Sequence, residues 1–143
     1  MGEPSTIAHQ VYDTYGRGDL EACIRLFAPD CQVIFPGAPL ISGPEQLRPF
    51  LQVQLTAFPN GHHRVLRMIE QGSLVAAELL FTGEQTGPYE TPSGTIPPSG
   101  RQVTFESVDI VEVTAGRIAS WRVYIDTAAM MAQLTASPAL ASA

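Results

Sequence analysis

Residues 101–126 read RQVTFESVDIVEVTAGRIASWRVYID, and this stretch decides the fold of the chain. Two runs rich in Val, Ile and aromatic residues flank the turn sequence Thr114-Ala115-Gly116, a pattern that predicts a β-hairpin. Side chains alternate between the two faces of a strand. The predicted inward rows are therefore Phe105, Ser107, Asp109, Val111 and Val113 on the first strand and Ala119, Trp121, Val123 and Ile125 on the second.

Asp109 is the exceptional member of these rows because it is the one ionisable residue in them. If both rows lie on the same face of the sheet, its carboxyl is surrounded by Trp and Val side chains. Desolvation disfavours the carboxylate and raises its pKa, which can make a catalytic acid or a hydrogen-bond donor. The alternative is an Asp109 that faces solvent or pairs with an arginine.

Composition limits the class of protein and its partners. A chain of 143 residues with 45% hydrophobic and 15% charged residues is expected to form one globular domain, which we place at residues 1–136. The small-residue segment 137–143 is expected to be a disordered tail. The net charge of −6 argues against nucleic acid or an anionic membrane as partner, since both attract basic surfaces.

The N-terminal residues show neither a basic region nor an apolar run, and no stretch approaches 18 apolar residues, so we expect a cytoplasmic protein. In a reducing compartment Cys23 and Cys31 are expected to be buried free thiols rather than a disulfide.

Ahead of the hairpin, the pattern predicts three helices. The first opens at Pro4-Ser5-Thr6 and ends at Gly16. The second is capped by Asp19, runs through Phe27 and is stopped by Pro29. The third starts at Pro44, and Pro49 is expected to kink it or delay its start.

The remaining segments complete a sheet. Residues 31–35 predict a short strand, and residues 62–70 and 74–85 predict two longer strands, the second with clear alternation. The Gly- and Pro-rich residues 87–100 are expected to form a surface loop without helix or strand, which could cover a site. Residues 127–134 predict a short final helix. The expected fold is α+β, with three helices packed on a strongly curved mixed or antiparallel sheet around a conical cavity.

Four segments carry a resemblance to a known family. They are GDLEACIRLFAPDCQVIFPG (residues 18–37), FPNGHH (58–63), TGPYETPSGTIPPSGRQVTFE (86–106) and AGRIASWRVYIDTAAMMAQL (115–134). Together they resemble the SnoaL-like polyketide cyclases, within the superfamily of nuclear transport factor 2-like folds. This resemblance implies a cone-shaped fold, a small apolar substrate and a homodimer formed through the outer sheet face. Because this fold supports many functions, it implies the fold more firmly than the chemistry.

At three positions the chain differs from catalytic patterns of related families. Val123 stands where the aldol-forming cyclases carry an acid after an arginine. Residues 79–81 lack the arginine and aspartate of limonene epoxide hydrolases, and Phe35 occupies the place of the base of ketosteroid isomerase. Asp109, in contrast, falls where ketosteroid isomerase carries a protonated, hydrogen-bond-donating aspartate.

Asp109 and His63 are therefore the candidate catalytic residues. A neutral His63 at the pocket mouth could act as the base, although a surface histidine without a role is the alternative. Candidate substrate-pocket residues are Tyr15, Phe35, Trp121 and Val123. Tyr12 could likewise place a hydroxyl in the cavity, but aromatic residues at helical spacing are more often core. No ligand spacing predicts a metal site, and Asp126 is interpreted as the cap of the final helix.

Three functions are consistent with these residues, and the third of them is an accessory protein for an oxidoreductase. The first is a cofactor-independent cyclase or isomerase that uses acid/base catalysis on an apolar, oxygenated intermediate such as a polyketide, by enolate chemistry or epoxide opening. The second is a small-molecule-binding or partner-interaction domain that kept the cavity and lost the catalytic groups.

Overall fold

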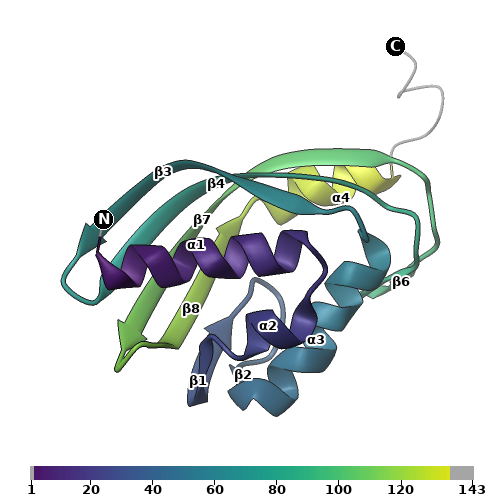
Figure 1. Ribbon diagram of the computed structural model, residues 1–143. Coiled ribbons are helices and arrows are strands. Elements are labelled where there is room, and N and C mark those ends of the chain that lie inside the picture. The colour runs from purple at the N-terminus through teal and green to yellow at the C-terminus, as the bar shows by residue number, and fades with distance from the viewer. Residues whose placement is uncertain (1, 136–143) are drawn as a thin grey trace.

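The computed structural model describes residues 2–135, which form a mixed sheet covered by helices (Figure 1). The sheet order is β2-β1-β8-β7-β4-β3, with β1 parallel to β8 and every other pair antiparallel. Its strands are β1 (Phe27–Ile34), β2 (Ile41–Ser42), β3 (His62–Gln71), β4 (Leu74–Glu84), β7 (Gln102–Thr114) and β8 (Arg117–Ile125). The helices are α1 (Glu3–Gly16), α2 (Leu20–Ile24), α3 (Gly43–Ala57) and α4 (Thr127–Thr135). The predicted α+β class is confirmed.

The hairpin predicted at residues 101–126 is formed by β7 and β8. Ala115 and Gly116 take positive φ angles of 52° and 77° at the turn, and the register places Asp109 opposite Val123 and Val111 opposite Trp121. One residue was misplaced. A bulge next to Val113 puts Ile118, rather than Ala119, opposite it in the buried row. Such a bulge adds one residue and shifts the alternation, which an alternation pattern alone does not reveal.

Helix α1 lies across the face of the sheet and packs on β3, β4 and β7 (Figure 1). Its buried side includes Ile7, Ala8 and Val11, at the spacing of one helical face. Glu70 of β3 holds the start of the helix, because its carboxylate accepts hydrogen bonds from the backbone N–H (2.9 Å) and the hydroxyl (2.7 Å) of Ser5. This contact places the tyrosines of α1 over the sheet.

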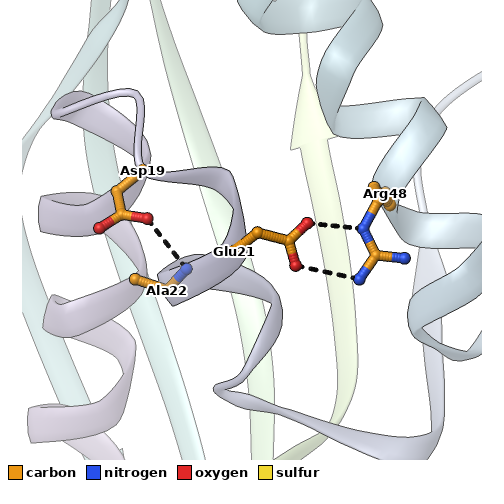
Figure 2. Close-up of polar contacts among 4 residues, drawn as sticks. All are labelled: Asp19, Glu21, Ala22 and Arg48. Atoms are coloured by element: carbon orange, nitrogen blue, oxygen red, sulfur yellow. Dashed lines mark hydrogen bonds and ion pairs between the residues drawn. The ribbon is translucent and has the colours of Figure 1, made fainter.

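Helix α2 is shorter than predicted. Asp19 caps it as expected, accepting a hydrogen bond from the N–H of Ala22 at 3.1 Å (Figure 2). The helix ends at Ile24, however, and Phe27 opens β1, where it pairs with Ile118 of β8. Pairing with a strand more than 90 residues away overrides the local helical spacing, so the prediction that the helix extends through Phe27 was wrong.

Helix α3 begins at Gly43 and keeps Pro49 in its interior, so the proline does not delay the start of the helix. An exposed ion pair links this helix to α2: the guanidinium of Arg48 donates to both carboxylate oxygens of Glu21, at 2.7 Å and 3.1 Å (Figure 2). Solvent screening makes the energetic contribution of such a pair small.

The segment expected to be an irregular loop contains a hairpin of two short strands, β5 (Tyr89–Thr91) and β6 (Gly94–Ile96). The prediction that residues 87–100 hold no strand was therefore wrong. Buried Gln85 organises the segment. Its side-chain N–H₂ donates to the carbonyls of Gly87, Ile96 and Pro97 at 3.1 Å each, and its carbonyl accepts from the hydroxyl of Ser99 at 2.7 Å. Because β5 and β6 pair over only a short length, the hydrogen bonds of this one buried carboxamide hold the segment together.

Cys23 and Cys31 are buried free thiols, as predicted. The expected tail, residues 137–143, lies outside the described residues. Among the helices of the described part, none is long and apolar enough to cross a membrane.

Candidate active site

A cavity of about 120 Å³ lies between the sheet and the helices. All six residues selected from the sequence line it: Tyr15, Phe35, His63, Asp109, Trp121 and Val123. Most of its wall is apolar and aromatic, with Phe27, Phe35, Phe50, Phe58, Phe81 and Phe105 among the lining residues. Within this lining, Asp109 is the one carboxyl, and no lysine or arginine is present. The cavity therefore suits an uncharged, largely apolar molecule.

Asp109 is almost completely buried, with 4% of its surface exposed. It lies in a row across the sheet between Ala77 of β4 and Val123 of β8. Its Oδ2 accepts a hydrogen bond from the hydroxyl of Tyr12 at 2.8 Å, while its Oδ1 is buried without a hydrogen-bond partner among the described residues. The alternative of a solvent-facing or arginine-paired Asp109 is thus contradicted.

Burial raises the pKa of Asp109 from 3.8 to about 7. The Tyr12 hydrogen bond and the nearby indole N–H of Trp121 favour the carboxylate and oppose this rise, although the indole completes no hydrogen bond of standard geometry with Oδ1. Desolvation outweighs both effects because the surrounding side chains are apolar. Near neutral pH the carboxyl is therefore present in both its protonated and its ionised form.

Tyr12 is the residue whose role the sequence did not reveal. It belongs to the buried face of α1, and its ring lies edge-on to Trp121 with centroids 5.5 Å apart. The pKa of its hydroxyl is raised well above its ordinary value by burial and by Asp109, so it remains a neutral donor. Helical spacing predicts that such a tyrosine is buried, but its partner is 97 positions away and could not be read from the sequence.

His63 lines the cavity from the start of β3 and is half-buried. It pairs with Phe81 across β3 and β4, and its ring lies 5.5 Å from Tyr12, 5.6 Å from Tyr15 and 5.0 Å from Phe81 between centroids. Burial, with a smaller contribution from the charge of His62, lowers its pKa to about 4. The imidazole is therefore neutral at pH 7, and its Nδ1 is buried with no hydrogen-bond partner within residues 2–135.

His63 and Asp109 do not meet directly. Phe81 links their strands through its pairing with Phe105, which lies four residues before Asp109 on β7. Standard strand dimensions then separate the two backbones by about 13 Å along the strands and about 10 Å across them. The ring of Tyr12 lies near both residues. A molecule that contacts both groups must extend along this part of the cavity.

Asp126 lies outside the cavity lining. Its Oδ1 accepts a hydrogen bond from the backbone N–H of Ala129 at 3.0 Å, so it caps α4 as predicted. Within residues 2–135 there is no cluster of three or more metal-ligating side chains.

Helices packed on a mixed sheet around a buried apolar cavity define a protein of the nuclear transport factor 2-like and ketosteroid isomerase-like fold. Within that class, the chain belongs to the SnoaL-like polyketide cyclase family, whose sequence profile matches residues 5–134. No curated protein is significantly similar to the chain.

Solved structures share the fold of this chain. A SnoaL-like protein from Jannaschia sp. CCS1, proposed to be a polyketide cyclase, has a TM-score of 0.85 and 24% identity, with 95% of this chain and 94% of that chain covered. IdmH from Streptomyces antibioticus, also a proposed polyketide cyclase, has a TM-score of 0.77 and 26% identity, with 93% and 99% covered. AclR from Streptomyces galilaeus, a proposed hydroxylase, has a TM-score of 0.79 and 18% identity, with 95% and 83% covered. Proteins of different proposed chemistry therefore share this fold, and the function must be argued from the site.

Proposed function

We propose that this protein is a cofactor-independent cyclase or isomerase that acts by acid/base catalysis on an uncharged, apolar, oxygenated small molecule of polyketide type. One observation carries the proposal: in the described part of the chain the cavity holds a single carboxyl, buried among aromatic side chains, with one oxygen fixed by Tyr12 and the other without a partner. Perturbed pKa values at the wall of a cavity are typical of catalytic groups. The family and its proposed cyclases support the same reaction class.

In the proposed mechanism, the protonated form of Asp109 donates a hydrogen bond or a proton through Oδ1 to an oxygen of the substrate. Tyr12 holds Oδ2 and keeps the carboxyl in one orientation. Because the pKa is about 7, the proton is available at neutral pH and is returned readily after the reaction. The surrounding apolar side chains keep bulk water away and strengthen the interaction with the charge that develops on the substrate oxygen.

The second step requires a group that removes a proton from the substrate. His63 is neutral at pH 7 and can accept one, but a pKa of about 4 makes it a weak base. We assign this role to His63 or to a water molecule beside it. Tyr15, Phe35, Trp121 and Val123 form the pocket wall, and Trp121 offers an edge or face to a planar substrate. Ring closure through an enolate, isomerisation of an enone and opening of an epoxide all fit this arrangement.

The test uses the variant Asp109→Asn, which keeps the shape of the side chain and removes the transferable proton. Two probe reactions test ring closure and isomerisation: ring closure of a linear triketone, and conversion of a β,γ-unsaturated cyclic ketone to its conjugated isomer, which is followed by ultraviolet absorbance. We expect kcat for the active probe to fall about a hundredfold or more, with retained folding. Asp126→Asn is the matched control outside the cavity, and unchanged turnover in Asp109→Asn would remove Asp109 from the mechanism.

The apolar residues Val123 and Phe35, at positions where related enzymes carry acids, favour a second candidate, a small-molecule-binding or partner-interaction domain of the same fold. In that case calorimetry would detect binding of apolar ligands while no probe is converted, and Asp109→Asn would change affinity alone.

A homodimer stays a prediction in either case. Sedimentation velocity tests it, and substitution of the exposed Tyr124 on β8 by Glu is expected to dissociate it.

A further inference from the structure

The cavity contains a second group of polar side chains besides Asp109 and Tyr12. Tyr15 of α1, Gln54 of α3 and Tyr89 of β5 all line it. We call these three residues the distal polar site. The hydroxyls of Tyr15 and Tyr89 are close enough to interact electrostatically, and the Gln54 carboxamide lies beside the Tyr89 hydroxyl. Three elements that are far apart in the sequence thus bring their polar groups to one part of an apolar cavity.

The distal polar site lies on the His63 side of the cavity. Tyr12 and Tyr15 are one turn apart on α1, which separates them by about 4.5 Å along the helix axis. The ring of Tyr12 lies 5.5 Å from both Trp121 and His63, so it stands between them. The ring of Tyr15 lies 5.6 Å from His63. A ligand that reaches from Asp109 to Tyr15 must therefore pass the ring of Tyr12.

The two tyrosine hydroxyls are free to bind a ligand. Neither makes a hydrogen bond of standard geometry with a side chain or backbone group in the described part of the chain, although the nearby Gln54 carboxamide favours the ionised form of Tyr89 and opposes the rise in its pKa. Burial raises the pKa of both hydroxyls, which are therefore neutral donors and acceptors. A buried polar group usually has a partner, so these hydroxyls are suited to one supplied by a bound molecule.

The position of Tyr89 is fixed by the protein. Gln85, which is fully buried, ties the segment around β5 and β6 together through its hydrogen bonds to Gly87, Ile96 and Pro97. The backbone at Gly87 passes so close to Thr56 of α3 that a Cβ at Gly87 would collide with the carbonyl oxygen of Thr56. The ring of Tyr89 packs edge-on against Phe58 with centroids 5.5 Å apart. A donor held in this way binds without the entropic cost of ordering a mobile segment.

The charges of the lining decide the chemical class of the bound group. An anionic group would be desolvated there without a counterion, because neither lysine nor arginine lines the cavity and His63 is neutral at pH 7. Phenol hydroxyls and a carboxamide instead match a neutral oxygen, as found in a hydroxyl or a carbonyl.

We propose that Tyr15, Gln54 and Tyr89 bind a second, uncharged oxygen of the substrate, remote from the oxygen that reacts at Asp109. The substrate is then a neutral molecule that carries a hydroxyl or carbonyl at each of two separated positions on an apolar body. The assignment of the reacting oxygen to Asp109 rests on the proposed function, whereas binding at the distal polar site does not require catalysis.

Titration calorimetry with non-reacting probes tests the proposal. The probes are 2-naphthol, with one hydroxyl, and 2,6- and 2,7-dihydroxynaphthalene, which add a second hydroxyl at two different positions. One neutral hydrogen bond corresponds to a gain of roughly 3- to 10-fold in affinity. We expect at least one of the two diols to bind the wild-type protein more tightly than 2-naphthol by this factor. The double variant Tyr15→Phe/Tyr89→Phe is expected to abolish the gain of the diols over 2-naphthol.

Tyr124→Phe is the matched control, because Tyr124 is a half-exposed tyrosine of β8 that does not line the cavity. Equal affinity for diols and 2-naphthol, or a gain that persists in the double variant, would overturn the proposal. Tighter binding of 6-hydroxy-2-naphthoate than of both diols would overturn the assignment to an uncharged oxygen. Asp109→Asn separates this proposal from the catalytic one, since it is expected to remove turnover and to keep the diol gain.

Discussion

Replacement of Asp109 by Asn should stabilise the folded protein above neutral pH. The folded state keeps the proton of Asp109 up to a pKa of about 7, whereas the unfolded chain loses it near 3.8. Between these values the folded state binds more protons than the unfolded state, so the free energy of unfolding falls as the pH rises. The loss begins near pH 4 and is complete above about pH 7.

The size of the effect follows from the displacement of the pKa from 3.8 to about 7. Each pKa unit corresponds to about 1.4 kcal/mol, so the ionised carboxyl costs the folded state about 4 kcal/mol at pH 8. Solvent screening does not reduce this free-energy cost appreciably, since only 4% of the surface of Asp109 is exposed. Asn cannot ionise and can still accept the hydrogen bond of Tyr12, so the variant avoids this cost. For a domain of ordinary stability, about 4 kcal/mol is a large fraction of the total.

Urea unfolding of the wild type and the Asp109→Asn variant at a series of pH values from 4 to 8.5 measures the effect. The difference between the two free energies of unfolding cancels every other titrating group and isolates Asp109. We expect a small difference at pH 4 that grows in favour of the variant and levels off above pH 7. Asp126→Asn controls for the loss of one carboxyl from the chain. A difference that stays constant across the range would show that Asp109 titrates alike in both states, and it would refute the argument from desolvation.

Three further substitutions test the roles of single side chains. Val123→Asp places a second carboxyl opposite Asp109 on the neighbouring strand, where the two groups should share one proton. The variant is therefore expected to fold at pH 5, to lose stability steeply toward pH 8 in denaturation curves, and to lose the native reaction. Asp126→Ala removes the cap of α4, which costs roughly 1 kcal/mol and should lower the melting temperature by about 3 to 5 °C with full activity per folded molecule. Loss of activity at unchanged stability would assign a catalytic role to Asp126. Gln85→Glu replaces the N–H₂ group that donates to three carbonyls by an acceptor oxygen, so calorimetry is expected to show a loss of roughly 3 kcal/mol in the free energy of unfolding. An unchanged melting temperature would show that the segment around β5 and β6 does not depend on this residue.

Local chemistry determined the elements of this fold. The alternation of apolar residues in β7 has a period of two, and this period alone assigns Asp109 to the same face as Val111. The register between β7 and β8 then puts Trp121 on that face as well. Caps act within three residues, so Asp19 and Asp126 could be assigned from their neighbours. The main order of helices and strands followed from these local patterns, and the SnoaL-like family profile matches residues 5–134.

Where the local sequence pattern predicted the wrong structure, contacts between distant parts of the chain determined the actual one. Phe27 has the spacing of a helical residue, but it becomes part of β1 because Ile118 of β8 pairs with it. Ile118 replaces Ala119 in the buried row because a bulge shifts the alternation. Gln85 has no local signal at all, since its partners lie up to 14 residues further along the chain and form only when the segment folds back.

The sequence by itself determined that an aspartate would lie in an apolar row, and it selected residues that line one cavity. Only the tertiary structure decided the chemical state of that aspartate. Its pKa depends on how completely the helices exclude water and on the hydroxyl of Tyr12, which α1 brings to 2.8 Å from Oδ2 of Asp109, 97 residues further along the chain. Desolvation and hydrogen bonding depend on distances in space, and neither is a property of neighbours in the sequence.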